Sequence, residues 1–172
     1  MTRKNIVILV STAGLLAFFL IGLEYRLHYV IWNLAHGNAL DWQGKRLKAG
    51  KGAYFLPPAD PKSVFLFSPG DKKSLVHVSI DRIDPVKGRT AARKACEAMR
   101  CSAYQEREYK YENTQIFEVS YSGAEGDPER DTRATIWLGE RGITIEYSGD
   151  QKGLQRWKGR IDALIAQIAK PG

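Results

Sequence analysis

The stretch ITIEYSGDQKGLQRWKGRIDALIAQIA, from Ile143 to Ala169, decides the fold class of this chain. Its first residues alternate apolar and polar side chains, which predicts a strand over residues 142–147. From Asp150 onward the apolar residues recur every three or four positions, which predicts an amphipathic helix over residues 150–169 that Ser148 or Asp150 caps. A strand that runs into a long one-sided helix requires a sheet for that helix to cover.

Six upstream segments alternate in the same way and predict further strands. They are residues 53–56, 63–67, 75–80, 102–111, 114–121 and 131–138. Ser68-Pro69-Gly70-Asp71 is a strong turn sequence, and the short links at 112–113 and 139–141 predict two hairpins. Strands joined by such short turns form a mainly antiparallel sheet.

A second helix is predicted over residues 90–99, with Thr90 as its N-cap. The polar residues 122–130 predict an exposed loop. Two amphipathic helices must cover a sheet face, so the predicted fold is an α+β domain with a mainly antiparallel sheet covered by two helices. This domain is expected to span residues 41–172.

Length and composition exclude several classes of protein. The 172 residues suffice for one domain, and 44% hydrophobic with 26% charged residues excludes global disorder. The mean hydropathy of −0.34 excludes a polytopic membrane protein. The net charge of +7 comes without the interleaved stacking aromatics of single-strand binders, so nucleic acid is not an expected partner.

The N-terminal sequence predicts a membrane anchor. Residues 6–23 (IVILVSTAGLLAFFLIGL) carry no charge, and a helix of this length covers about 27 Å, close to a hydrocarbon core. Leu23-Glu24-Tyr25 lacks the small residues that a signal peptidase needs, which favours an uncleaved anchor. A removed signal peptide and a buried core helix are the alternatives.

Flanking charges predict the orientation of this anchor. Arg3 and Lys4 lie in the tail of residues 1–5, whereas residues 24–43 contain Arg26 as their single basic residue. By the positive-inside rule the N-terminus is cytoplasmic and the domain lies outside, in the periplasm of a bacterial inner membrane.

Residues 24–40 are expected to form an interfacial helix next to the membrane. Tyr25, Tyr29 and Trp32 share one helical face and suit the membrane interface, although docking to a membrane partner is an alternative. The nearby basic cluster is a second candidate for contact with anionic lipid, at about 1 kcal/mol per residue. It comprises Lys45, Arg46, Lys48 and Lys51.

The two cysteines, Cys96 and Cys101, favour a structural disulfide if the domain lies outside the cytoplasm. On a regular helix, two cysteines five positions apart point in different directions. A disulfide between them therefore requires the helix to unwind at Arg100. A redox-active pair lacks the CxxC spacing, and free thiols are the other alternative.

No arrangement of residues identifies an active site. His77 has Ser79 on the same strand face, but a lone strand histidine is typical of a structural or surface residue. His77, Asp81 and Asp84, or Asp127, Glu129 and Asp131, lack the spacing of a metal site. Glu106, Glu108, Glu118 and Glu146 are expected on the solvated face of the sheet. The glycine patterns of nucleotide sites are also absent from the sequence. Together with the unsuitable spacings above, this means that neither a metal nor a cofactor is expected.

Tyrosines concentrate in the hairpin of residues 102–121 and suggest a partner interface. Tyr109 and Tyr111 share a face with Arg107, whereas Tyr104 points with Glu106 and Glu108 to the other face. Exposed Tyr and Arg are typical interface anchors, and ordinary sheet packing is the alternative.

The opening segment Lys48-Ala-Gly-Lys-Gly-Ala-Tyr-Phe55 and the closing strand and helix from Ile143 to Ile168 resemble the PsbP-like family over residues 50–169. That family often opens with a Pro-x-Gly-Trp-like motif, whose proline and tryptophan are missing here. The resemblance implies helices packed on an antiparallel sheet, and an accessory or binding subunit rather than an enzyme.

These features together favour a non-catalytic, single-pass accessory or binding subunit of a cell-envelope complex. Its expected partners are membrane lipid and a membrane or periplasmic protein. A membrane-tethered envelope hydrolase that uses carboxylates or His77 is one alternative, and a membrane immunity or inhibitor protein is another.

Overall fold

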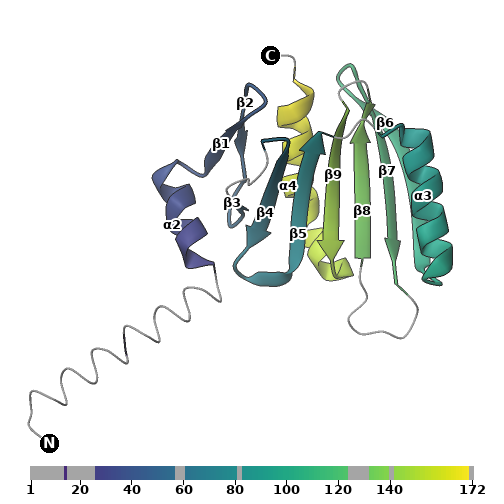
Figure 1. The fold of residues 1–172 in the computed structure, drawn as a ribbon, viewed down its shortest axis with the longest axis horizontal. Coiled ribbons are helices and arrows are strands. Elements are labelled where there is room, and N and C mark those ends of the chain that lie inside the picture. The colour runs from purple at the N-terminus through teal and green to yellow at the C-terminus, as the bar shows by residue number, and fades with distance from the viewer. Residues whose placement is uncertain are drawn as a thin grey trace, which may run out of the picture.

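The computed structural model describes Gly14 and residues 26–56, 61–80, 83–123, 132–139 and 142–170. The predicted anchor, apart from Gly14, and Tyr25 lie outside this part of the chain. Within it, no helix is both long enough and apolar enough to cross a membrane. The elements, shown in Figure 1, are α2 (Leu27–Ala35), β1 (Ala39–Trp42), β2 (Lys45–Lys48), β3 (Tyr54–Leu56), β4 (Ser63–Ser68), β5 (Asp71–Ile80), α3 (Pro85–Ala98), β6 (Ser102–Tyr111), β7 (Thr114–Ser122), β8 (Thr132–Leu138), β9 (Ile143–Gly149) and α4 (Gln151–Ala169).

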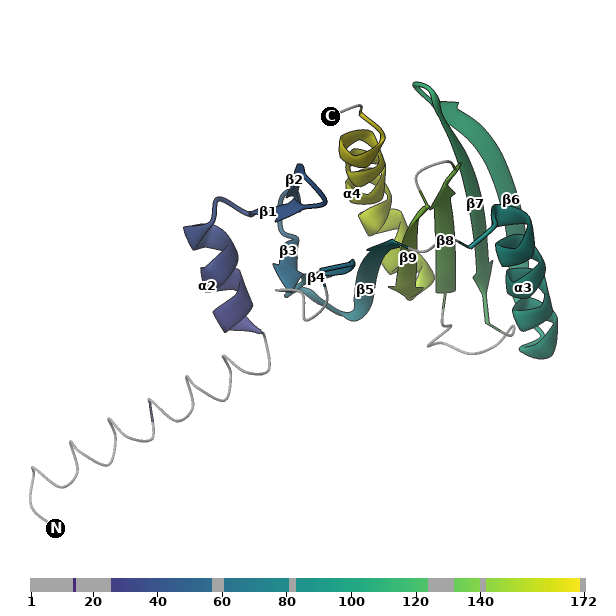
Figure 2. The same cartoon turned by 45° about the horizontal axis from the view of Figure 1, so that its top comes forward.

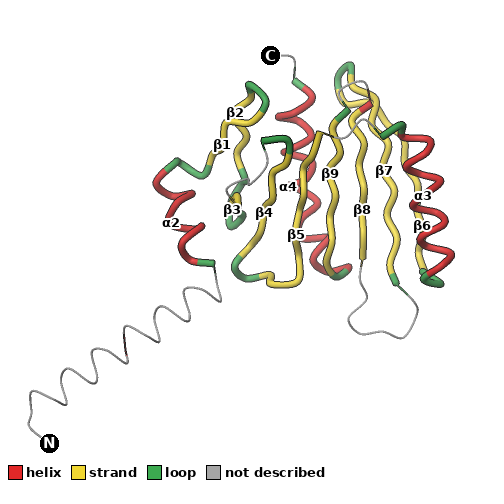
Figure 3. The backbone as a smooth tube through the Cα atoms, viewed as in Figure 1, coloured by secondary structure: helices red, strands yellow, loops and turns green. Residues whose placement is uncertain are grey.

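The predicted antiparallel α+β architecture is confirmed. Seven strands form one sheet in the order β3-β4-β5-β9-β8-β7-β6, and all neighbouring pairs are antiparallel. After β5 the chain crosses to the far edge through α3, returns along β6, β7 and β8, and inserts β9 next to β5 (Figure 3). The last strand therefore joins the two halves of the sheet.

The main core lies between the sheet and α4. Trp157, Leu164 and Ile168 of α4 are fully buried in one cluster with the inward side chains of the strands. Asp150 caps this helix as expected, because its side chain accepts a hydrogen bond from the Gly153 N–H.

The two predicted helices cover opposite faces of the sheet, not one face (Figure 2). Alternation along the strands explains this difference. Ile116 and Leu138 point toward α4, whereas Val119 and Trp137 point to the other face and pack with Cys96 of α3.

One local prediction is corrected. α3 begins at Pro85 rather than near Thr90, because the Asp84 side chain caps it by accepting from the Val86 N–H at 2.8 Å. Proline suits the first helical position because its φ is already helical. The predicted helix over residues 24–40 is described from Leu27 and ends at Ala35.

A further hairpin, β1–β2, was not predicted. Its strands have four residues each, and the turn places Gln43 and Gly44 at positive φ, as the tightest hairpins require. Trp42 and Leu47 of this hairpin are buried in the main core.

Candidate functional site

A groove lies between α3 and the centre of the sheet, on the face opposite α4. α3 contacts β6 and β7 at the edge, so the strands nearer the centre line an open cavity of about 480 Å³. Gly88, Ala92 and Ala95 form the helix side of this groove. Because these side chains are small, they do not project far into the groove. The polar groups of the groove come mainly from β5, β8 and β9.

His77 and Glu146 form a pair in this groove. They are register partners on β5 and β9, and His77 Nδ1 lies 3.1 Å from Glu146 Oε2. Phe65 of β4 stacks on the imidazole at 4.3 Å between ring centroids. The carboxylate orients the ring and could exchange a proton with it. The hydrogen-bond partner of His77 is therefore Glu146 and not the Ser79 hydroxyl considered from the sequence.

Thr144 supplies a polar group at the floor of the groove. Its side chain is 3% exposed, and Oγ1 has no hydrogen-bond partner within the described residues. An unpaired buried hydroxyl costs about 1–3 kcal/mol, so this oxygen favours a water or ligand that can pair with it. The sequence does not single out Thr144. The alternation of β9 shows on which face of the sheet this side chain lies, but not that its hydroxyl lacks a hydrogen-bond partner.

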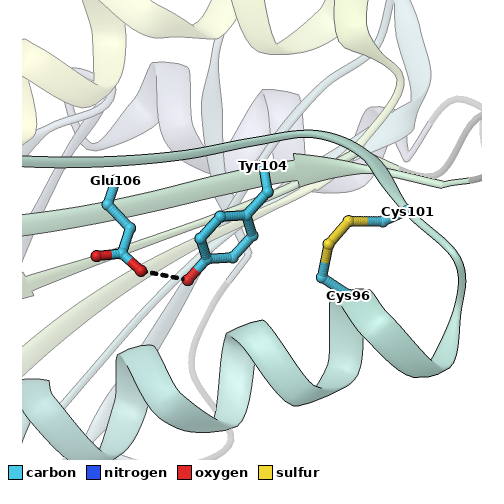
Figure 4. Close-up of a disulfide and its surroundings, with 4 residues drawn as sticks. All are labelled: Cys96, Cys101, Tyr104 and Glu106. Atoms are coloured by element: carbon cyan, nitrogen blue, oxygen red, sulfur yellow. Dashed lines mark hydrogen bonds between the residues drawn. A yellow bond between two sulfur atoms is a disulfide. The ribbon is translucent and has the colours of Figure 1, made fainter.

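The disulfide between Cys96 and Cys101 is present, as predicted (Figure 4). It links the last turn of α3 to the residue before β6, with a Cα–Cα distance of 4.9 Å. Arg100 has a positive φ, so the chain leaves the helix between the two cysteines. The predicted unwinding at Arg100 is what allows the two sulfurs to meet.

Tyr104 and Glu106 belong to a polar network that holds α3 against β6. The Tyr104 hydroxyl and the Arg93 guanidinium both donate to Glu106 Oε1 at 2.7 Å (Figure 4 shows the Tyr104 bond). These bonds, that of Tyr104 first, lower the pKa of the Glu106 carboxyl, while burial raises the pKa of Tyr104. Glu106 is thus an ionised structural acceptor, not a general acid.

The other predicted interface residues of β6 face α4. Tyr109 and Tyr111 pack against the main core, and burial raises the pKa of Tyr109 to about 12. Arg107 is exposed and lines a second cleft of about 300 Å³ with Glu118 of β7 and Asp162 of α4. The structure therefore divides the four residues: Tyr104 lies on one face of the sheet, and Arg107, Tyr109 and Tyr111 lie on the other.

Helix α2 is fixed to the domain by one buried side chain. Asn33 is 0% exposed; its Nδ2 donates to the Phe55 carbonyl at 2.7 Å, and its Oδ1 accepts from the Phe55 N–H at 2.9 Å. The amide thereby pairs with edge strand β3 as a neighbouring strand would. Sequence analysis missed Asn33, although a single amide in the apolar run LHYVIWNLA is a usable signal.

The residues predicted to meet the membrane lie in different settings. Tyr29 is half-buried with its ring 6.2 Å from Phe67, and Trp32 stacks on His36. The most exposed apolar side chains of α2 are instead Ile31 and Leu34, at 64% and 65%.

The predicted basic cluster lies on and just after β2. Lys45 donates to the Lys170 carbonyl, and Lys48 bonds through its backbone to Gln167. Arg46 and Lys51 are exposed. Lys45 and Lys48 are therefore attached to the C-terminal end of α4, whereas the Lys51 carbonyl accepts from Arg160 in the middle of this helix.

Within the described ranges, no three His, Cys, Asp or Glu side chains come together as a metal site. Asp84 serves as the N-cap of α3. Asp81, Asp127, Glu129 and Asp131 lie outside these ranges.

Comparison with known proteins finds only weak similarities of fold. No family model and no curated protein matches the chain. The solution structure of cyanobacterial PsbP from Synechocystis sp. aligns with 72% of this chain and 83% of its own, at 14% identity and a TM-score of 0.41. A protein of unknown function from Pseudomonas aeruginosa aligns with 78% of this chain and 96% of its own, at 7% identity and a TM-score of 0.41. The predicted PsbP-like resemblance is confirmed as a weak similarity of fold.

Proposed function

We propose that this protein is a non-catalytic accessory or binding subunit, anchored in a bacterial inner membrane by residues 6–23 with its domain in the periplasm. The observation that carries this proposal is the attachment of α2. This helix begins four residues after the uncharged run, is fixed to the sheet by Asn33, and still displays Ile31 and Leu34. Such a helix holds the domain close to the bilayer and offers an apolar surface to a membrane partner.

The disulfide supports the location of the domain. Structural disulfides persist in oxidising compartments such as the periplasm and are rare in the cytoplasm. Cys96 and Cys101 join two elements by a local link, as expected of a structural bond.

The proposal is tested by purifying the tagged full-length protein from its native membrane in mild detergent. We expect a stoichiometric partner that is lost from the Ile31→Ser/Leu34→Ser variant. The matched control, Val86→Ser/Met99→Ser, removes two exposed apolar side chains elsewhere and should retain the partner. Elution of the protein alone, or equal loss in both variants, would contradict the proposal. An alkaline phosphatase fused after Gly172 should be active if the domain is periplasmic.

One observation favours a second function, a membrane-tethered hydrolase. His77 and Glu146 form an oriented histidine–carboxylate pair in a cavity of about 480 Å³. If this pair is catalytic, His77→Gln should abolish hydrolysis of a cell-envelope substrate. Glu118→Gln changes a carboxylate on the opposite face and should leave that hydrolysis intact.

A further inference from the structure

Arg26 directly precedes α2 and is exposed. Arg26 is the N-cap of α2 and has a left-handed backbone, with φ of 55°, which is not the conformation of a regular α-helix. Its guanidinium lies 5.5 Å from the centroid of the Phe67 ring, near the end of β4. A cavity of about 290 Å³ at this point is lined by Arg26, Pro69 and Lys72 among others. The β4–β5 turn therefore lies directly beside Arg26.

The distance from the predicted anchor to Arg26 is short. Arg26 is three residues after Leu23, so their Cα atoms are at most about 11 Å apart, even in an extended chain. The headgroup layer on each side of a bilayer is about 5–8 Å thick. Arg26 must therefore lie in the headgroup layer or within a few ångströms of it. This step rests on the proposed anchor.

Two contacts fix the orientation of the domain relative to Arg26 and α2. Arg26 stacks on Phe67 of β4 at the start of α2, and Asn33 pairs with Phe55 of β3 near its end. Because both attachments reach the same edge of the sheet, α2 cannot swing freely relative to the domain. The side of the domain that meets the bilayer is then set by what surrounds Arg26.

The surroundings of Arg26 are basic. Lys72 lines the same cavity as Arg26, and Lys73 is the next residue of β5; both lysines are exposed. Asp71 is bound by Arg156 at 3.0 Å, which compensates its charge. We propose that Arg26, Lys72 and Lys73, the basic corner, contact anionic lipid headgroups and set the orientation of the domain on the membrane.

The basic cluster predicted from the sequence lies elsewhere. The β4–β5 turn is bound to α4 at Arg156, whereas Lys48 is bound to α4 at Gln167. Eleven residues of helix separate these two points by about 16 Å. In Figure 1 the β1–β2 hairpin lies at the upper side of the molecule and the β4–β5 turn at its lower side. The screening length at physiological salt is about 8 Å, so Lys48 and the hairpin residue Arg46 are too far from the basic corner to contribute substantially. Lys51 lies nearer, because its carbonyl accepts from Arg160, one helical turn from Arg156.

The test measures lipid proximity in the full-length protein, reconstituted in vesicles that contain one-quarter anionic phosphatidylglycerol. A Gly70→Cys variant carries a fluorophore in the β4–β5 turn, where an added side chain meets no atom within 4 Å. The matched control is Arg46→Cys, in the exposed part of the sequence-predicted cluster. The native cysteines remain bonded to each other. Headgroup spin-labelled lipid should quench the fluorophore at position 70 and leave position 46 bright.

Charge dependence provides the second arm of the test. Lys72→Gln/Lys73→Gln should reduce quenching at position 70, because each base in the headgroup layer shifts the ratio of docked to undocked corners about fivefold. Arg46→Gln/Lys48→Gln should not reduce it. Quenching at position 46 that equals that at position 70, no quenching at position 70, or no effect of removing Lys72 and Lys73 would overturn the inference. Flotation of the protein with vesicles at alkaline pH tests the anchor separately, so failure of the proposed function is distinguishable.

Discussion

Two side-chain amides pair with the backbone of a strand in this protein. Asn33 bonds both the N–H and the carbonyl of Phe55, and Gln167 does the same with Lys48. The two amides differ in burial: Asn33 is fully buried, whereas the bonds of Gln167 are exposed to solvent. The two amides should therefore contribute differently to the free energy of unfolding. Water can replace the exposed bonds of Gln167 but not the buried bonds of Asn33.

Asn33→Ala should lower the free energy of unfolding by about 2–4 kcal/mol, because it leaves the Phe55 N–H and carbonyl buried without partners. Gln167→Ala removes the same number of strand contacts and should cost less than about 1 kcal/mol. Urea denaturation of both variants measures the difference. Equal losses would show that Asn33 does not cap the edge of β3 in solution.

Tyr147 is the most buried tyrosine with a polar role. Its hydroxyl donates to the Asp150 carbonyl at 2.8 Å and lies 2.8 Å from Ser74 Oγ. An added Cβ on Gly149 or Gly153 would collide with this hydroxyl, so both glycines leave the space that it fills. Burial is the main cause that raises the pKa of Tyr147 to about 12, from 10.0.

This shift predicts a loss of stability at alkaline pH. Because the folded protein holds the Tyr147 proton more tightly than the unfolded chain, the contribution is complete below pH 10 and is lost as the pH rises toward about 12. Tyr147→Phe should be less stable than the wild type at pH 8 and should lose less stability between pH 10 and 12. Urea midpoints at several pH values provide the measurement. Parallel pH curves for the two proteins would be inconsistent with a raised pKa.

At the scale of elements, α3 approaches the sheet closely at Gly88. A Cβ built on Gly88 would lie 2.6 Å from Cζ2 of Trp137, whose indole is 5% exposed. The absence of a side chain at position 88 thus lets the helix reach the sheet. Gly159 of α4 has no atom within 4 Å of the corresponding position.

Gly88→Ala should destabilise the protein by about 1–2 kcal/mol, because the overlap with Trp137 outweighs the roughly 1 kcal/mol gain in helix propensity. Gly159→Ala should instead raise stability by about 0.5–1 kcal/mol, since the same gain meets no overlap. Thermal or urea unfolding of the pair gives opposite signs. Stabilisation by both substitutions would show that α3 can shift away from the sheet without cost.

Local patterns explain which elements could be predicted. Strand alternation and the 3.6-residue period are properties of neighbouring residues, and they identified the seven-stranded sheet and α4. The start of α3 was missed because Asp84-Pro85 has the composition of a turn as well as of a helix cap. The β1–β2 hairpin was missed because strands of four residues show too little alternation to detect.

Features of the site that depend on distant residues were not predictable. Strand alternation correctly placed Tyr104 on one face of the sheet and Tyr109 and Tyr111 on the other. It did not show what covers each face. The His77–Glu146 pair joins residues 69 positions apart and exists only because β9 inserts beside β5. The groove likewise depends on the position of α3 over the far edge of the sheet. This position cannot be inferred from the sequence of any single segment.

At the scale of the whole molecule, α2 belongs to the domain that was expected to begin at residue 41. A chain of residues 26–172 keeps the Asn33 pair, whereas a chain of residues 41–172 exposes the outer backbone of β3. The shorter chain should be less stable by at least about 2 kcal/mol and should self-associate, because an uncovered strand edge pairs with other chains. Urea unfolding and sedimentation velocity test this prediction. Equal stability and a monomeric 41–172 chain would show that α2 is not part of the folded unit.

The central position of β9 has a consequence for how the protein is made. Pairing between β5 and β9 joins segments about 70 residues apart, so the middle of the sheet stays open until β9 (Ile143–Gly149) has been synthesised. If the domain is exported, β5 emerges long before its partner does. Until β9 pairs with it, we expect the open edge of β5 to bind chaperones or to associate with other chains.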